Sequence, residues 1–417
     1  MSATGAAHDR HPGPLSGMRV LELAQIMAGP TCGMMLADMG ADVVKVEKLP
    51  GGDDARGYAE PRVNGVSAPF LIMNRNKRGM ALDLKHPRGR EVLLRLVKTA
   101  DVVTENFRRG TLEKFGVGYD VLAQTNPGLI YCAVSGYGRD GPLANQGGFD
   151  LIAQGFAGLM SITGERGRPP VKTGNSVADI NAGLLAASAI VAAYVHKLKT
   201  GEGQVVDTSL MEAALQQTYW QAAIYFATGE SPGPTGSAHV LTAPYQAFRT
   251  NDGWINIGGA NQANWERIAG VLGHPEWCAD PRFASNSARM ENIEVLAALM
   301  EMVLVTRSKA EWIEAFEAAG VPVGPVNSLG EALNHPQTRA RGMVVDLRHP
   351  EAGATRALGC PVHFSATPTR VVRPAPLLGE HTREVLQECG YTESEIDALI
   401  ADGVVEAHGS THIRTRL

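Results

Sequence analysis

The segment that decides the fold runs from Met18 to Lys48 and reads MRVLELAQIMAGPTCGMMLADMGADVVKVEK. Residues 18–24 and 42–48 have the composition of buried strands, and residues 31–39 resemble a short helix rich in Met and small side chains. Strand, helix and strand within about 30 residues form a parallel βαβ unit with a right-handed crossover. The segment therefore predicts an α/β fold.

The same alternation continues along the first half of the chain. Strand patterns recur at 80–84, 101–105 and 129–134, with a helical pattern at 88–99. We predict a doubly wound, parallel-sheet large domain whose first part spans residues 15–225. Its later elements are predicted helices at 150–159, 180–199 and 210–228, with a strand at 204–208.

A second domain is predicted after a segment rich in Gly, Pro and Ser at 229–243. Residues 245–257 have the pattern of a hairpin that turns at Asn251-Asp252-Gly253. Helical periodicity follows at 265–272, 292–306 and 309–319. We predict a smaller α+β domain at 226–326. Residues 327–417 then form a linker and a return to the large domain, with a final helix at 380–389.

Composition excludes several classes of function. The 417 residues include 38 basic and 43 acidic side chains, a net charge of −5, which argues against a nucleic-acid or anionic-membrane surface. The cysteines show no paired metal-ligand spacing, so they predict free thiols in a reducing cytoplasm and no metal site: Cys32, Cys132, Cys278, Cys360 and Cys389. No secretory pattern precedes the first strand. The longest apolar run, 183–195, is shorter than the roughly 20 residues of a membrane span and predicts a core helix.

A dinucleotide-binding enzyme is one alternative for such a fold. The turn after the first strand contains only Gly29 and Gly33 of a glycine-rich fingerprint, although Glu47 lies where a ribose-binding acid would be. An acid at a strand end is a weak signal by itself. The chain has no P-loop, no G-x-S-x-G and no H-E-x-x-H motif, so the common phosphate, serine-hydrolase and zinc chemistries are not indicated.

Several blocks, taken together, resemble the class III coenzyme A transferases, a family that includes formyl-CoA transferase and carnitine CoA-transferase. The resemblance covers nearly the whole chain, in the order LSGMRVLELAQIMAGP, ADMGADVVKVEKLPGGDDAR, NRNKRGMALDLK, ENFRRGTLEKFGVGYD, GGFDLIAQGFAGLMSITG, KTGEGQVVD and LGEHTREVL. It implies an acyl-CoA substrate, a small carboxylic acid as second substrate, no tightly bound cofactor and an interlocked homodimer.

Asp179 is the candidate nucleophile. From the residue pattern alone, an acid beside a helix predicted to begin near Ile180 is typical of an N-cap. The resemblance instead matches it to the family's catalytic aspartate. The two roles are compatible, because a helix N-terminus favours the carboxylate that would attack a thioester. Attack would expel CoA thiolate and form an aspartyl anhydride, which the acceptor acid and the retained thiolate would convert to a new thioester.

The resemblance also places the CoA contacts, although each single Lys or Arg could be an ordinary solvated side chain. They are spread over several turns at one sheet edge and include the residues beside the pantetheine arm: Met27, Lys48, Leu82, Asp83, Lys85, Asn106, Phe107, Arg108, Lys114, Gly147, Gly148, Phe149 and Asp150. A glycine-rich loop at Gly258, Gly259 and Ala260 would supply backbone N–H groups to an oxyanion. The alternative for this loop is a plain strand-to-helix turn before Trp265.

Departures from the family bear on the substrate. Formyl-CoA transferase has a glutamine at the position of Met27 and a tryptophan at that of Tyr58, so a formyl and oxalate pair is not expected. The related 2-methylacyl-CoA racemases have a histidine where this chain has Phe149, and racemisation requires such a second acid–base group. Racemisation and a catalytically silent CoA-binding protein remain the alternatives. A small dicarboxylate such as succinate is the expected partner acid.

Overall fold

The computed structural model describes residues 13–409, which form two compact units. The large unit comprises the described residues up to 157, then 174–217, and those from 336 onward. The small unit comprises 158–173 and 218–335. The large unit is therefore discontinuous in sequence. The chain enters the main part of the small unit at 218, against the predicted 226, and leaves it after 335, against the predicted 326.

A seven-stranded sheet forms the centre of the large unit. Its order is β14-β5-β2-β1-β6-β7-β8, and all pairs are parallel except β14 with β5. The strands are β1 (Arg19–Glu22), β2 (Asp42–Glu47), β5 (Arg78–Leu82), β6 (Val102–Glu105), β7 (Ile130–Ser135), β8 (Val205–Ser209) and β14 (Val405–Glu406). The order grows outward from β1 in both directions, so the fold is a mixed α/β fold with a predominantly parallel sheet.

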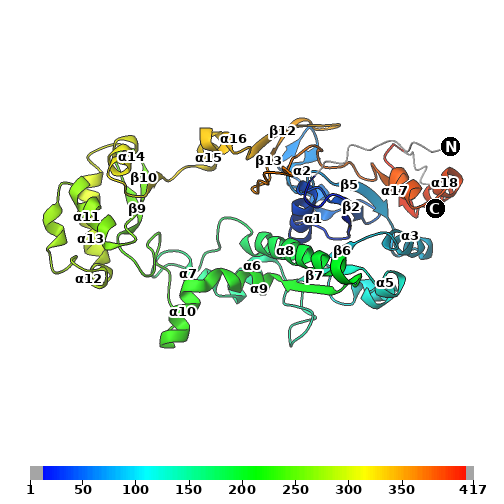
Figure 1. Ribbon diagram of the computed structural model, residues 1–417, viewed down its shortest axis with the longest axis horizontal. Helices are drawn as coiled ribbons and strands as arrows, with labels where there is room; N and C mark the ends of the chain where they lie inside the picture. Colours follow the sequence, from blue (N-terminus) through cyan, green and yellow to red (C-terminus); the bar gives the residue numbers. More distant parts are fainter. Residues whose placement is uncertain (1–12, 410–417) are drawn as a thin grey trace. The chain divides into compact units, whose positions relative to one another are not determined.

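Helices pack on both faces of this sheet, because side chains alternate along each buried strand. Leu21 and Leu23 belong to a core with the apolar faces of α3 (Pro87–Val97), α5 (Tyr119–Thr125), α17 (Thr382–Glu388) and α18 (Glu393–Ala401). Figure 1 shows α3 near α17 and α18, where Arg95 donates to Gly390 O at 2.6 Å. Glu22 faces the opposite layer, which contains α1 (Ala28–Asp38) and α8 (Val177–Thr200).

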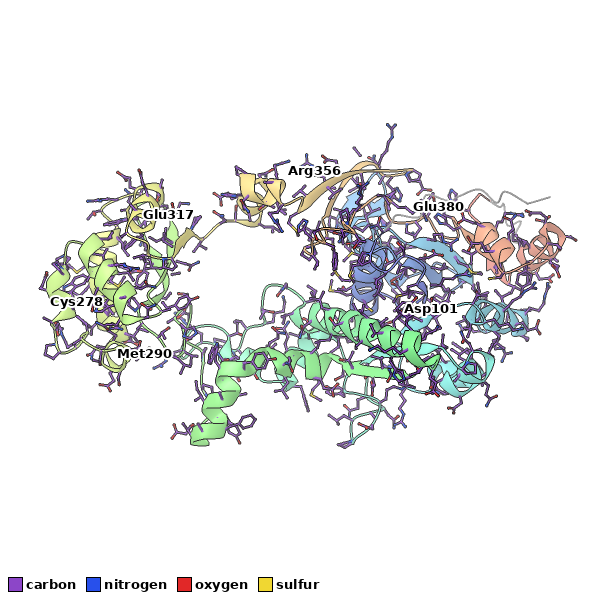
Figure 2. All side chains as sticks on the ribbon, in the orientation of Figure 1. Asp101, Cys278, Met290, Glu317, Arg356 and Glu380 are labelled. Carbon is purple, nitrogen blue, oxygen red and sulfur yellow. The ribbon has the colours of Figure 1, made fainter. Side chains whose placement is uncertain are left out.

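The helix α8 is the one described helix long and apolar enough to cross a membrane by length and composition. It packs along α1, α9 (Leu210–Leu215), β7 and β8, as a core helix of a globular unit does. At its far end Lys197 Nζ lies 2.6 Å from Oδ1 of Asp101, which is labelled in Figure 2. This ion pair joins the last turn of α8 to the start of β6.

Two predicted helices are interrupted. The helix predicted at 150–159 is α6 (Asp150–Phe156) followed by α7 (Leu159–Ile162), and Gly158 between them has a left-handed φ of 82°. The helix predicted at 210–228 is α9, a 3₁₀ turn at Gln216–Thr218, and α10 (Tyr219–Thr228). The predicted final helix is α17. The helix α18 and the strand β14, which follow it, were not predicted. The strand β14 has only two residues and therefore no alternating pattern.

Shorter elements complete the large unit. A second small core of Ala55, Phe70, Leu71, Met73, Ala352 and Ala375 lies among them, and Met27 packs against it. The elements are a 3₁₀ turn at Asp54–Gly57, β3 (Arg62–Val63), β4 (Val66–Ser67), α2 (Ala68–Met73), α4 (Thr111–Lys114), α16 (Pro336–Ala340), β12 (Val344–His349) and β13 (Gly353–Leu358).

The small unit has an antiparallel sheet of order β11-β10-β9. Its hairpin pairs Trp254 with Arg249, as predicted for 245–257. Aromatic side chains fill its core, with Trp265, Trp312, Phe248, Phe283 and Phe316 at most 1% exposed. The elements not yet named are β9 (Tyr245–Arg249), β10 (Trp254–Gly258), α11 (Gln262–Val271), a 3₁₀ turn at Pro275–Cys278, α12 (Asn286–Glu291), α13 (Ile293–Leu304), α14 (Lys309–Ala318), β11 (Val323–Pro325) and α15 (Leu329–Asn334).

Candidate active site

A cavity of about 440 Å³ opens at the carboxyl ends of β1, β6 and β7. This is where the strand order reverses, the place at which doubly wound sheets bind ligands. Its lining includes Asp179 and residues from four turns: Gln25, Ile26, Met27, Ala28, Asn106, Phe107, Arg108, Arg109, Thr111, Val134, Ser135, Gly136, Ala144, Gln146, Gly147, Gly148, Phe149 and Leu210. We call it the Asp179 cavity.

A second cavity of about 170 Å³ lies beside it and shares Gln25, Phe107 and Thr111 with it. Lys48, Leu82, Asp83 and Lys85 line this second cavity, at the ends of β2 and β5. Together the two cavities bring eleven of the thirteen predicted CoA contacts to one sheet edge. The other two, Lys114 and Asp150, line neither cavity.

Asp179 is in the first turn of α8, which begins at Val177 with Ser176 as its N-cap. It is therefore not the N-cap, and the predicted start near Ile180 was three residues late. Among the described residues its carboxylate has no hydrogen-bond or ion-pair partner. Burial, and secondly the negative charge of Asp150, raise the pKa of Asp179 to about 6. A desolvated, unpartnered carboxylate of raised pKa is a better nucleophile than a solvated one.

Asp150 has the capping role that the sequence pattern suggested for Asp179. Its Oδ1 accepts from the backbone N–H of Ala178 at 2.9 Å and lies 3.4 Å from that of Asp179, although it belongs to α6. Its Oδ2 accepts from Nε2 of the buried Gln154 at 2.6 Å. Asp150 therefore satisfies the free N–H groups of α8 from a neighbouring helix and fixes the turn that carries Asp179.

Replacement of Asp150 with Asn should shift the pH dependence of catalysis. The amide oxygen still accepts from Ala178, but the negative charge that raises the pKa of Asp179 is lost. Activity that requires the Asp179 carboxylate falls as the pH drops through about 6, and in Asp150→Asn this midpoint should move to lower pH. The measurement is kcat/KM against pH, with the exposed Asp140→Asn as control. An unchanged midpoint would show that Asp150 does not act on Asp179.

The glycines at 147 and 148 permit close approaches beside the cavity. A side chain on Gly148 would lie 2.7 Å from the Cα atom of Gly136, and one on Gly147 would lie 3.2 Å from Nε of Arg108. Arg108 and Arg109 are exposed and make no ion pair with any described residue. The cavity that holds Asp179 therefore presents two free guanidinium groups to an anion.

The glycine-rich loop of the small unit uses its first two N–H groups internally. Gly258 N donates to Pro322 O at 2.9 Å, and Gly259 N donates to Pro244 O at 2.7 Å. A side chain on Gly259 would lie 2.4 Å from Pro244 O, so this glycine permits a close approach of two backbone segments. The exposed Ala260 is the one residue of the predicted three whose N–H has no partner among the described residues.

The dinucleotide alternative lacks its ribose-binding acid. Both carboxylate oxygens of Glu47 accept from Arg56 at 2.7 Å, and Oε2 also accepts from Asp53 N at 3.0 Å. Gly29 and Gly33 are tightly packed against Ala24 and Glu22. Neither the acid nor the glycines are thus available to a dinucleotide.

Sequence reasoning missed several residues that line the Asp179 cavity. Arg109 adjoins Arg108, and the doubled charge was a usable signal. Gln25 and Ile26 directly follow the first strand, which in such folds is itself a signal. Ser135 and Gly136 follow β7 in the same way.

Comparisons with known proteins find a matching family and several similar chains. Residues 15–382 match the model of CoA-transferase family III. A succinate–glutarate CoA-transferase of Agrobacterium fabrum is 41% identical over 90% of this chain and 95% of its own length. A succinyl-CoA–D-citramalate CoA-transferase of Chloroflexus aurantiacus is 36% identical, over 95% and 99%. The crystal structure of a CAIB/BAIF family protein from Brucella suis has a TM-score of 0.82 and 39% identity, covering 91% of this chain and all of that one.

Proposed function

The chain belongs to CoA-transferase family III, and we propose that the carboxylate of Asp179 is the nucleophile of its reaction. The chain is an enzyme that moves a CoA thioester from an acyl-CoA to a free carboxylic acid. The observation that carries the proposal is the position of Asp179: it lies inside the large cavity, unpartnered among the described residues, with a raised pKa. The named relatives are transferases, so the racemase alternative is not favoured, and Phe149 is 71% exposed at the position that a racemase would fill with histidine.

The proposed steps balance without any other reactant. The Asp179 carboxylate attacks the thioester carbonyl and the C–S bond breaks. CoA departs as a thiolate, and an aspartyl–acyl anhydride is formed on Asp179. The acceptor carboxylate then attacks the aspartyl carbonyl. This attack releases the donor acid as a carboxylate and forms a second anhydride, between Asp179 and the acceptor acid. The retained thiolate then attacks the acceptor's carbonyl, giving the new thioester and restoring Asp179. No net proton is transferred.

A dicarboxylate is the proposed acceptor, and succinyl-CoA is the proposed donor. Relatives at 35–41% identity are named for succinate, glutarate or succinyl-CoA. Arg108 and Arg109 support the proposal, because two unpaired guanidinium groups can neutralise both a CoA phosphate and the second carboxylate of a bound dicarboxylate. Phosphates would in turn reach Lys48 and Lys85 in the adjoining cavity.

Trapping of the intermediate tests the proposal. The protein is incubated with succinyl-CoA and hydroxylamine, which attacks the aspartyl carbonyl of an anhydride and leaves a hydroxamate on that aspartate. Mass spectrometry of the digested protein should place this modification on Asp179. Modification of a different residue, or none while transfer proceeds, would contradict the proposal.

Lys85 allows a separate test of the CoA-binding surface. It lines the smaller cavity, and Lys85→Gln should weaken CoA binding by about 1–2 kcal/mol, as expected for a partly exposed phosphate contact. Titration calorimetry with CoA measures the effect. Lys98→Gln is the control. Lys98 is exposed at the C-cap of α3, shortly before β6 begins, and so lies at the amino-terminal rather than the carboxyl-terminal end of the strands. Equal affinities of the two variants would place the phosphates elsewhere.

A homodimer and a cytoplasmic location are also proposed. The helix α10 has no buried residue, and it exposes Tyr219, Trp220, Tyr225 and, at 83%, Phe226. Exposed aromatic side chains in such number mark a protein–protein interface. The mass in solution at micromolar concentration should be that of two chains.

All five cysteines are free thiols, which suits a reducing compartment such as the cytoplasm.

A further inference from the structure

The turn between β1 and α1 has an uncommon conformation where it lines the Asp179 cavity. Ile26 has a φ of 68°, in the left-handed region that a β-branched side chain strongly disfavours. Gln25, Ile26 and Met27 all line this cavity, and Gln25 also lines the smaller one. A strained residue persists only where surrounding contacts hold it, and such residues are typical of functional sites.

Hydrogen bonds from three side chains hold the backbone of this turn. Asn106 and Gln25 bond reciprocally, with Gln25 N to Oδ1 at 2.9 Å and Nδ2 to Gln25 O at 2.8 Å. Lys45 Nζ donates to Ala24 O at 2.9 Å. The N–H of Ile26 itself lies 3.0 and 3.1 Å from the two carboxylate oxygens of Asp53. Asp53 is therefore the contact made directly to the strained residue.

Asp53 is itself firmly held. It is 3% exposed, and its Oδ2 lies 2.8 Å from Nζ of the fully buried Lys45. Its Oδ1 also accepts from Ala55 N at 2.9 Å, and its own N–H donates to Glu47 at 3.0 Å. Lys45 and Asp53 thus form one buried ion pair whose two members each bond to the turn: Lys45 donates to Ala24 O, and Asp53 accepts from the N–H of Ile26.

We propose that Asp53 is a positioning residue of the transfer reaction, which holds Ile26 in the left-handed conformation and so fixes the Gln25–Met27 wall of the Asp179 cavity. Without this carboxylate, Ile26 relaxes toward negative φ, and Met27 and the first turn of α1 move with it. Displacement of a reacting group by about 1 Å can cost roughly a hundredfold in rate. The proposal rests on the proposed function, because it takes the Asp179 cavity as the place of reaction.

Paired variants of Asp53 and Ile26 test the proposal. Asp53→Ala should lower kcat about 10- to 100-fold while KM for succinyl-CoA changes less than about threefold, since Lys48 and Lys85, which line the same smaller cavity as Asp53, keep their charges. Asp53→Asn keeps an oxygen for the Ile26 N–H and should fall between Asp53→Ala and the wild type. Ile26→Gly is the reference for the double variant, because glycine adopts this φ without strain but also removes a side chain from the cavity wall.

The double variant Ile26→Gly/Asp53→Ala decides between positioning and mere structural support. If Asp53 acts through the strain at Ile26, glycine should restore kcat about tenfold relative to Asp53→Ala alone. If Asp53 only supports the fold, the double variant is as impaired as the single one, and the proposal is overturned. Circular dichroism monitors folding, and Asp346→Ala, an exposed acid on β12, is the control.

Failure of the Asp53 proposal can be distinguished from failure of the proposed function, because the two are tested by different measurements. Hydroxylamine trapping reports whether Asp179 carries the acyl group, whereas the Asp53 variants are compared by the rate of CoA transfer alone. Should Asp53→Ala fail to fold, Asp53→Asn with and without Ile26→Gly gives the same comparison. Equal kcat for wild type and a folded Asp53→Ala would also refute the proposal.

Discussion

Replacement of Asp179 with Asn should reduce CoA transfer by at least about a thousandfold. The amide has nearly the shape of the carboxylate but cannot attack a thioester and carry the acyl group as an anhydride. The effect is large because an obligatory nucleophile is removed rather than one contact. The measurement is transfer from succinyl-CoA to glutarate, with Asp179→Ala as a second variant.

Two further measurements make this result specific to the carboxylate. CoA affinity should change little in Asp179→Asn, because the predicted phosphate contacts at Lys48 and Lys85 line the adjoining cavity. Asp179→Glu keeps the acid but displaces it by about 1 Å, which can cost about a hundredfold, so it should be impaired yet remain sensitive to pH. Near wild-type transfer by a folded Asp179→Asn would refute the proposed mechanism.

Replacement of Glu22 with Ala should lower the free energy of unfolding by about 3–5 kcal/mol. Glu22 is completely buried on β1, where its Oε1 accepts from Lys45 at 3.1 Å and from Lys77 at 3.0 Å. Its Oε2 lies 2.8 Å from Lys77 but accepts no well-directed hydrogen bond. Without the carboxylate, two fully buried ammonium groups lose their common counter-ion.

The pH dependence of this effect follows from Lys77. Burial lowers the pKa of Lys77 to about 8, with the charge of Glu22 opposing the shift. Loss of Glu22 lowers that pKa further, so at neutral pH the folded variant must release a proton that the unfolded chain keeps. Because the unfolded state then binds more protons, stability rises with pH. Wild-type Lys77 loses its proton in the same way only near its own folded pKa of about 8, so the deficit of Glu22→Ala should shrink between neutral pH and about pH 8 and stay constant above it.

Urea unfolding at several pH values measures these changes. Glu22→Leu/Lys77→Met, which removes one charge of each sign, should be less destabilised than Glu22→Leu alone, and Lys45 keeps Asp53 as its partner in both. Arg356→Ala is the control, since its ion pair with Asp346 is exposed, and its unfolding should match the wild type. A wild-type stability of Glu22→Ala would show that the buried network is not formed.

The local pattern of the sequence was sufficient for the order of the main elements. Buried strands such as 42–48 and helices such as 88–99 follow from side-chain periodicity, which is set by backbone geometry within one element. The local pattern was insufficient where the boundary of an element is set by a residue far away in the sequence. The start of α8 at Val177 depends on Asp150, whose carboxylate caps the helix by accepting from the N–H of Ala178, 28 residues away in sequence.

By itself, the sequence determined the α/β class, the resemblance to the CoA transferases and the choice of Asp179 as candidate nucleophile. Only the tertiary structure decided the surroundings of that carboxylate: the cavity, the charge of Asp150 and the raised pKa. It also decided that Glu22, Lys45, Lys77 and Asp53 form a buried network, although the first two are charges within apolar strands. The physical reason is that desolvation and ion pairing depend on distances between residues far apart in the chain, which local periodicity does not contain.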